Sequence, residues 1–281
     1  MSKPTWIHRF HSLAISPLLM TPYIIPLRAL KDNYIWVIRD HCHAAVVDPG
    51  EAAPVLDYLR RENLKLIAIL NTHHHNDHVG GNAALLSEFS VPVYGPAKES
   101  VSTVTRPLKE CAEKENEEGI VYLAEFSLSL RVLDIPGHTA GHIAYYGANM
   151  LFCGDTLFAC GCGRLFEGTA PQMVQSLEKL SDLPNGTLVY CGHEYTLDNI
   201  RFARVVEPGS EALIEREKTV EHLRKQNAPT LPSTIGLEKA TNPFLRCGQS
   251  EIIRNASKHA GRELADPVSV FAVLREWKNS F

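Results

Sequence analysis

The strongest constraint on this chain is a histidine-rich segment at residues 72–81, which reads THHHNDHVGG. Four of the 13 histidines lie within six positions, and Asp77 lies among them. The segment follows residues 64–70, a run that is apolar apart from Lys65 and is typical of a strand buried on both faces. Imidazole and carboxylate groups are ligands of zinc, iron and manganese. The sequence therefore predicts a metal site at the end of a buried strand, rather than a solvent-exposed histidine-rich loop.

The order of side chains within this segment predicts which of them bind metal. Side chains of an extended chain alternate between two sides, so His73 and His75 are expected to project together and His74 to the opposite side. The chain must then turn to bring the next carboxylate and imidazole to a neighbouring position. The glycine pair at 80–81 allows the backbone to pass closely and start a helix. One cation cannot easily accept all these groups, whereas two can share them, and His74 is expected not to be a ligand.

Three later segments each carry a potential ligand directly after a predicted strand and before a turn. These ligands are His138, Asp155 and His193. Loops at one edge of a rigid sheet commonly build active sites, so we expect these side chains to join the histidine-rich segment. Two further residues, Asp48 and His142, are expected to hydrogen-bond the free ring nitrogen of a ligand.

The order of predicted elements divides the chain in two. A length of 281 residues suits one large domain or two. Short β-rich runs alternate with helical patterns up to about residue 193, and almost only helical periodicity follows. We therefore predict an N-terminal extension over 1–20, an α/β catalytic domain over 21–192 and a smaller all-helical domain over 193–281. A segment rich in Glu and Lys at 109–118 is expected to be a solvated helix or loop.

Composition argues against several classes of partner. Lys and Arg number 28 and Asp and Glu 32, so the net charge of −4 supplies no overall basic field for nucleic acid or a membrane surface. No apolar run reaches the ~18 residues of a membrane span. Seven cysteines are too few for a disulfide scaffold and odd in number, which favours the reducing cytoplasm. Residues 1–20 loosely resemble a targeting peptide, which leaves an organelle or export as the alternative.

The motif at 72–78, followed by the three later ligands, is similar to the signature of the metallo-β-lactamase superfamily. The resemblance implies an αββα sandwich with two divalent metal ions at one sheet edge, zinc being the first choice and iron or manganese the alternatives. It also implies a division of the ligands. The first ion would take His73, His75 and His138, the second Asp77, His78 and His193, and Asp155 would bridge the two.

Three further segments resemble the glyoxalase II (hydroxyacylglutathione hydrolase) family within that superfamily: residues 29–34 (ALKDNY), 154–168 (GDTLFACGCGRLFEG) and 242–246 (NPFLR). The resemblance implies hydrolysis of S-2-hydroxyacylglutathione, above all S-D-lactoylglutathione, to glutathione and D-lactate in methylglyoxal detoxification. It also implies a helical substrate-binding domain and a set of substrate contacts. These contacts are Arg164, Phe166, Tyr195, Arg246 and Arg254.

At two of these positions the chain departs from the family pattern. The family often has lysine where Arg164 stands and tyrosine where Phe166 stands. Arginine keeps the positive charge and adds a planar fork that binds carboxylates. Phenylalanine keeps the ring and loses the hydroxyl, together with one possible substrate hydrogen bond.

The expected chemistry needs no protein nucleophile. Two cations that share a water lower its pKa to about 7, so a hydroxide between the ions would attack the thioester. Asp77 would be a ligand that also orients this hydroxide, and the leaving thiol, with a pKa near ~8.5, departs without a strong acid. The pair Cys160-x-Cys162 lacks the partners of a zinc site. The alternatives are a lactonase or β-lactamase-like hydrolase on the same fold, and a non-catalytic metal-binding module. A monomer is expected to act on this small-molecule thioester.

Overall fold

The computed structural model describes residues 22–110 and 119–281. The extension expected over 1–20 lies outside the described residues, as do residues 111–118 of the expected solvated segment. Within the described residues, no helix is long and apolar enough to cross a membrane.

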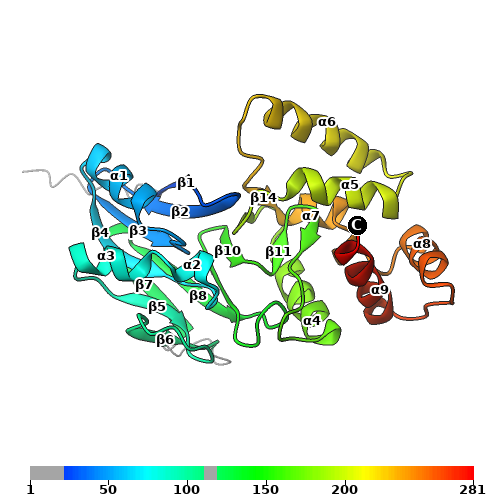
Figure 1. The fold of residues 1–281 in the computed structure, drawn as a ribbon, viewed down its shortest axis with the longest axis horizontal. Coiled ribbons are helices and arrows are strands. Elements are labelled where there is room, and N and C mark those ends of the chain that lie inside the picture. Colours follow the sequence, from blue (N-terminus) through cyan, green and yellow to red (C-terminus); the bar gives the residue numbers. More distant parts are fainter. Residues whose placement is uncertain (1–21, 111–118) are drawn as a thin grey trace, which may run out of the picture.

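The first half of the chain folds largely into one six-stranded mixed sheet (Figure 1). Its first three strands are antiparallel neighbours, and the following three pair in parallel. In spatial order they are β1 (Tyr23–Ala29), β2 (Asn33–Arg39), β3 (His43–Val47), β4 (Lys65–Leu70), β5 (Val93–Pro96) and β6 (Arg106–Leu108).

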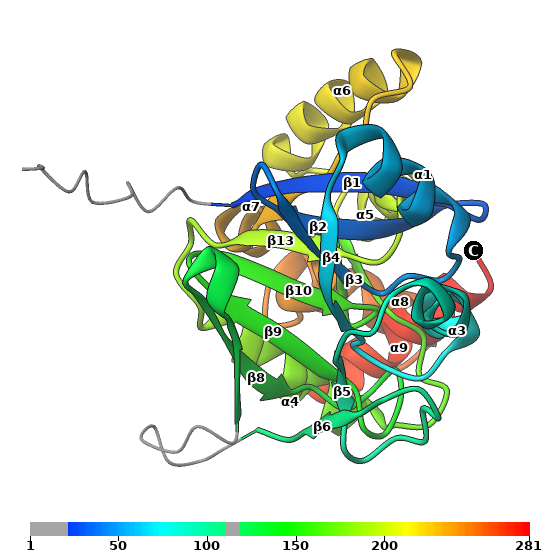
Figure 2. The same ribbon diagram turned by 90° about the vertical axis from the view of Figure 1, so that its left-hand side faces the viewer.

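A second six-stranded sheet packs against the first, and Figure 2 shows strands of this sheet side by side. All its neighbouring strands are antiparallel except β10 and β13, which are parallel. In spatial order they are β14 (Ser233–Thr234), β13 (Leu188–Cys191), β10 (Met150–Gly154), β9 (Ile143–Gly147), β8 (Leu128–Asp134) and β7 (Ile120–Leu123). A two-stranded ribbon, β11 (Leu157–Phe158) and β12 (Gly161–Cys162), follows β10.

Alternation along β2 shows how the layers are built. Trp36 and Ile38 belong to the main core between the sheets, whereas Ile35 and Val37 belong to a second core on the outer face. That outer core includes buried side chains of α1 (Ala53–Glu62) and α3 (Asn82–Glu88). Because successive strand residues face opposite sides, a strand covered on both faces is apolar throughout. Buried residues of α4 (Ala170–Ser181) join the main core from the second sheet's side.

The remaining helices follow the last strand of the sandwich. They are α5 (Thr196–Val206), α6 (Glu211–Lys225), α7 (Ile235–Thr241), α8 (Ser250–Ala260) and α9 (Pro267–Asn279), and Figure 1 shows them on the side of the molecule away from α1 and α3. Phe202 of α5 and Phe271 of α9 continue the main core, together with Phe244 of the short 3₁₀ helix Pro243–Leu245. Buried Glu238 of α7 accepts a hydrogen bond from the Cys160 backbone N–H at 2.8 Å, which ties the ribbon to the helical region.

The predicted fold class, an αββα sandwich followed by a smaller helical region, is confirmed. β9 and β10 form a hairpin, and Ala148 and Asn149 in its turn adopt the left-handed conformation that such a turn requires. The helical region is not entirely helical, because β14 adds an edge strand to the second sheet. The sequence patterns also missed β1, β6, β7, the β11–β12 ribbon, α7 and the short helix α2 (Asn76–Val79).

Candidate metal centre

The predicted ligands meet at one edge of the sandwich, each from a segment that follows a strand. The histidine-rich segment follows β4, His138 follows β8, Asp155 follows β10 and His193 follows β13. Close backbone packing is required here. Gly154 has φ +46°, and a Cβ atom built on it would lie 2.2 Å from the Thr72 hydroxyl oxygen. The two sheets are joined at this edge by the Tyr34 N–H, which donates to the Gly192 carbonyl at 2.8 Å.

The first group of three ligands is formed by His73, His75 and His138, whose ring nitrogens lie within 4.8 Å of one another. His75 Nδ1 is 3.1 Å from His73 Nε2 and 3.0 Å from His138 Nε2. The second group is formed by Asp77, His78 and His193, whose possible ligand atoms also lie within 4.8 Å of one another.

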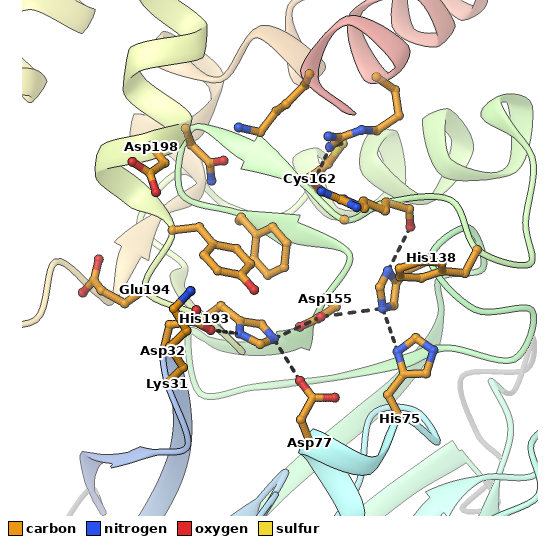
Figure 3. A pocket seen from close by; sticks show the side chains of 18 of the residues that line it. Lys31, Asp32, His75, Asp77, His138, Asp155, Cys162, His193, Glu194 and Asp198 are labelled. Atoms are coloured by element: carbon orange, nitrogen blue, oxygen red, sulfur yellow. Dashed lines mark hydrogen bonds and ion pairs between the residues drawn. The ribbon is translucent and has the colours of Figure 1, made fainter. Parts of the chain in front are cut away.

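Asp155 lies between the two groups (Figure 3). Its Oδ1 atom is 3.3 Å from His78 Nε2, and its Oδ2 atom is 3.2 Å from His193 Nε2 and 3.6 Å from His138 Nε2. One carboxylate thus faces imidazoles of both groups. This arrangement has the donor set expected of a carboxylate that bridges two cations.

The hydrogen bonds around the first group indicate that a cation belongs there. The His138 Nδ1–H donates to the Arg164 carbonyl at 2.9 Å, so Nε2 of this neutral ring carries a lone pair. The Thr72 hydroxyl donates to Asp48, which leaves it to accept from His73 Nδ1, so His73 Nε2 also carries a lone pair. Both lone pairs point at His75 Nδ1, which can donate to only one of them. A divalent cation would accept all three nitrogens.

The second group also contains buried polar atoms that a cation would satisfy. His78 Nε2 and Asp155 Oδ1 are buried and, although they lie 3.3 Å apart, neither makes a hydrogen bond of good geometry. The space beside them is kept open by Gly192, because a Cβ atom there would lie 2.6 Å from Asp155 Oδ1 and 2.7 Å from His78 Cε1. The residues present therefore fit two divalent metal ions.

Carboxylates and carbonyls behind the ligands orient their rings. Asp48 is 3.0 Å from His78 Nδ1, and Asp32 is 2.8 Å from His193 Nδ1. Asp48 therefore takes the role expected for it. His142 acts differently: its ring stacks on His73 at 4.6 Å, and its Nε2 accepts the Asp155 backbone N–H at 3.2 Å. Such contacts behind the ligands fix ring orientation and tautomer.

Burial and charge set the protonation of the cluster. Burial lowers the pKa of His73, His75 and His138, so these rings are neutral at pH 7 and can bind a cation. Burial would also lower the pKa of His78 and His193, but Asp155, together with Asp48 beside His78 and Asp32 beside His193, raises the pKa of both. Burial would raise the pKa of Asp155, but His78 and then His193 hold it well below its usual range.

A cavity of about 890 Å³ opens onto the cluster (Figure 3). Five of the predicted ligands line it, together with three of the predicted substrate contacts, Arg164, Phe166 and Tyr195. The Tyr195 ring stacks on His193 at 4.6 Å, and Phe166, which is 62% exposed, meets the His138 ring edge-on at 5.2 Å.

The structure does not bring Arg246 and Arg254 to this cavity. Arg246 is held by the buried carboxylate of Glu207, with Nε 3.2 Å from Oε2. Arg254 lies on α8 with a mostly exposed side chain 3.8 Å from Glu251. Both side chains are absent from the lining of the cavity among the described residues.

Two cations of α9 line the cavity instead, Arg275 and Lys278, and sequence reasoning missed both. The Arg275 side chain is only 4% exposed and donates to the Cys162 carbonyl at 2.7 Å. Burial and the charge of Arg275 lower the pKa of Lys278 to about 8. Their spacing of three residues places them on one helix face, but such a pair is typical of any solvated helix and gave no signal in the sequence.

Comparison with known proteins agrees with this geometry. Residues 30–193 match the metallo-beta-lactamase superfamily, and residues 194–281 match the hydroxyacylglutathione hydrolase C-terminus. The hydroxyacylglutathione hydrolase of Nitrosomonas europaea is 58% identical over 258 residues, which cover 92% of this chain and 96% of that protein. This chain belongs to the hydroxyacylglutathione hydrolase family of the metallo-β-lactamase superfamily.

Two solved structures extend the comparison. The fold is similar to that of ETHE1 from Myxococcus xanthus, with a TM-score of 0.60, 25% identity and coverage of 93% of this chain and 99% of that one. It is also similar to TTHA1623, solved in a di-iron-bound form, with a TM-score of 0.53, 25% identity and coverage of 79% and 100%.

Proposed function

We propose that this protein is a metal-dependent thioester hydrolase that cleaves S-2-hydroxyacylglutathione, with S-D-lactoylglutathione as the main substrate, to glutathione and a 2-hydroxy acid. The observation that carries the proposal is a single cavity that joins a two-cation ligand cluster to a set of free positive charges. The cluster suits hydrolysis of an activated carbonyl, and the positive charges suit the carboxylates of glutathione.

The ligands assigned to the two ions are those described above. When bound, two divalent cations supply a water of lowered pKa and a Lewis acid for the thioester carbonyl oxygen. Asp77 would orient that water. Its side chain is 40% exposed and lines the cavity, and Asn33 Nδ2 donates to its Oδ2 at 3.0 Å. Although burial opposes it, the charge of His78 lowers the pKa of Asp77, which stays a carboxylate at neutral pH.

The leaving group does not require a strong acid from the protein. A glutathione thiolate, with an ordinary thiol pKa near ~8.5, departs without a strong general acid. Tyr195 is the neutral donor beside the cluster, since burial and the charge of Asp32 raise its pKa and keep its hydroxyl protonated. It can therefore donate a hydrogen bond to a substrate oxygen throughout the physiological pH range.

The cations at the cavity wall would hold the substrate carboxylates. Within the described residues, no carboxylate forms an ion pair with Arg164, Arg275 or Lys278, although all three line one cavity. A buried guanidinium such as that of Arg275 is costly without a counter-charge, and an anionic substrate supplies one. We therefore assign the carboxylate contacts to these three residues rather than to Arg246 and Arg254.

The remaining assignments belong to the same proposal. Zinc is the first choice of metal, and the di-iron form of the similar TTHA1623 makes iron the leading alternative, followed by manganese. Residues 21–192 form the catalytic domain and 193–281 the substrate-binding domain. The protein works as a monomer in the cytoplasm, where its six described cysteines stay free thiols, as they are in this structure.

The test is hydrolysis of S-D-lactoylglutathione, followed with and without a chelator and alongside elemental analysis. The proposal expects turnover that a chelator abolishes, with two metal ions per chain. A lactone and a β-lactam are assayed in parallel. Faster turnover of either one than of the thioester would favour another hydrolase of this fold, and full metal occupancy without turnover would favour a metal-binding module.

A further inference from the structure

His74, the one histidine of the segment that ligates neither ion in the assignment above, lies between two carboxylates. Its Nδ1 is 2.9 Å from Glu99 Oε2, and its Nε2 is 3.4 Å from Glu167 Oε1. The alternation of side chains that turns His73 and His75 toward the metal cluster turns His74 toward these two acids.

Glu99 connects His74 to the loop that carries His138. Its side chain is 3% exposed, and its second oxygen, Oε1, accepts hydrogen bonds from the Thr139 hydroxyl and from the Gly141 N–H at 3.1 Å. Gly141 permits this approach, because a Cβ atom there would lie 2.6 Å from Glu99 Cγ. One buried carboxylate therefore holds the segment of His73 and His75 with one oxygen and the loop of His138 with the other.

Glu167 closes the arrangement from the opposite side. Its Oε2 accepts the Ala140 N–H at 2.8 Å, while the backbone N–H groups of Phe166 and Glu167 donate to the His138 carbonyl. This carboxylate is more exposed, 38% against 3% for Glu99, and its contact to His74 is longer. Glu99 is therefore the dominant partner of His74.

The contacts of Glu99, His74 and Glu167, here called the clamp, bear more directly on the first ligand group than on the second. All three ligands of the first group come from the two loops that Glu99 joins. In the second group, Asp77 and His78 share the histidine-rich segment but lie beyond His75 on α2, and His193 follows β13, which the clamp does not touch. We propose that Glu99 and His74 are positioning residues that set the spacing of the first metal site, His73–His75–His138, and leave the second site nearly independent.

This inference rests on the metal centre of the proposed function, but not on its substrate. His74, Glu99 and Glu167 have ligand atoms within 4.8 Å of one another and could in principle take a cation themselves. Their donors and acceptors are already paired, so we assign them to the clamp, and the stoichiometry of bound metal decides between the two roles.

The experiment measures zinc affinity in two backgrounds that each keep one site. The substitution His193→Ala removes a ligand of the second site, and His138→Ala removes one of the first. Glu99→Ala is added to each, and zinc is titrated into the metal-free protein in competition with a chromophoric chelator. Loss of a residue behind the ligands commonly costs about 10- to 100-fold in metal affinity. We expect that loss in the His193→Ala background, and a change below about threefold in the His138→Ala background.

Controls separate positioning from folding. Glu88, whose exposed carboxylate pairs with Arg60 on the surface, is replaced by alanine as the matched control and is expected to change neither affinity. Glu99→Gln keeps an acceptor for Thr139 and Gly141 and is expected to restore most of the affinity. Circular dichroism of each metal-free variant checks the fold, and His74→Leu replaces Glu99→Ala in the same scheme if that variant does not fold.

Three results would overturn the clamp. They are an equal loss in both backgrounds, no loss in the His193→Ala background, and a third equivalent of zinc that disappears with Glu99→Ala. The zinc titration uses no substrate, so it tests the clamp separately from the proposed function. If Glu99→Ala weakens zinc binding only in the His193→Ala background but the protein does not hydrolyse the thioester, the proposed substrate is rejected and the clamp is supported.

Discussion

Replacing Lys278 by methionine is expected to weaken substrate binding without weakening the chemical step. Methionine is unbranched, has a similar length and helix propensity, and can keep the packing beside Phe202, whose ring centre is 5.2 Å from the Lys278 Nζ. The metal ligands are untouched. The substitution therefore removes one positive charge from the cavity and little else.

The size of the effect follows from the charge that is lost. With a pKa of about 8, Lys278 is about 90% protonated at pH 7. A hydrogen bond between charged groups contributes about 1.5–3 kcal/mol, and each 1.4 kcal/mol is tenfold. The KM for S-D-lactoylglutathione should rise by on the order of 10- to 100-fold, while kcat changes by less than about threefold, as expected when ground-state and transition-state binding are lost together.

Steady-state kinetics of Lys278→Met and Arg246→Met provide the comparison. Arg246→Met leaves the buried Glu207 carboxylate without its partner, so the melting temperature should fall while the KM stays near that of the unchanged protein. A tenfold rise in KM for Arg246→Met, with an unchanged KM for Lys278→Met, would refute the assignment of the carboxylate contacts.

Three further predictions concern the cluster and its pH dependence. Asp48→Asn weakens the acceptor behind His78 and should cost about 10- to 100-fold in zinc affinity, measured by chelator competition, whereas unchanged affinity would deny Asp48 its orienting role. Gly192→Ala should lower the metal content found by elemental analysis, because its methyl group would occupy the space beside Asp155, and two full equivalents would contradict this. Lys278 is charged below its pKa of about 8 and neutral above it, so kcat/KM should fall as the pH rises through 8. Lys278→Arg should remove that fall, and an identical fall in both proteins would show that another group causes it.

The candidate metal ligands were predictable because their signal is local. The segment 72–78 places several ligands within one turn of chain, and the later ligands each follow an apolar strand. Alternation also predicted that His74 points away from the cluster. It could not predict Glu99 as the partner of His74, because the two residues are 25 positions apart and meet only through folding.

The positive charges that we propose to bind the substrate were not predictable in the same way. The residues next to an arginine in the sequence do not indicate whether its side chain lines a cavity, because tertiary contacts decide where the side chain lies. The carboxylate of Glu207, 39 positions away, binds Arg246 outside the cavity. The packing of α9 places Arg275 and Lys278 in the cavity wall. The missed strands have related causes: β11, β12 and β14 have two residues each, too few for any period, and Pro26 interrupts the pattern of β1.

The central claim is that each of the two ligand groups binds one cation and that Asp155 bridges the two cations. Its most direct test is a crystal structure of the zinc-loaded protein with anomalous data at the zinc edge. The account predicts two peaks, one within about 2.0–2.2 Å of the nearest nitrogens of His73, His75 and His138, and one within the same distance of Asp77, His78 and His193. A single peak, or a peak at His74, Glu99 and Glu167 with either ligand group empty, would contradict it.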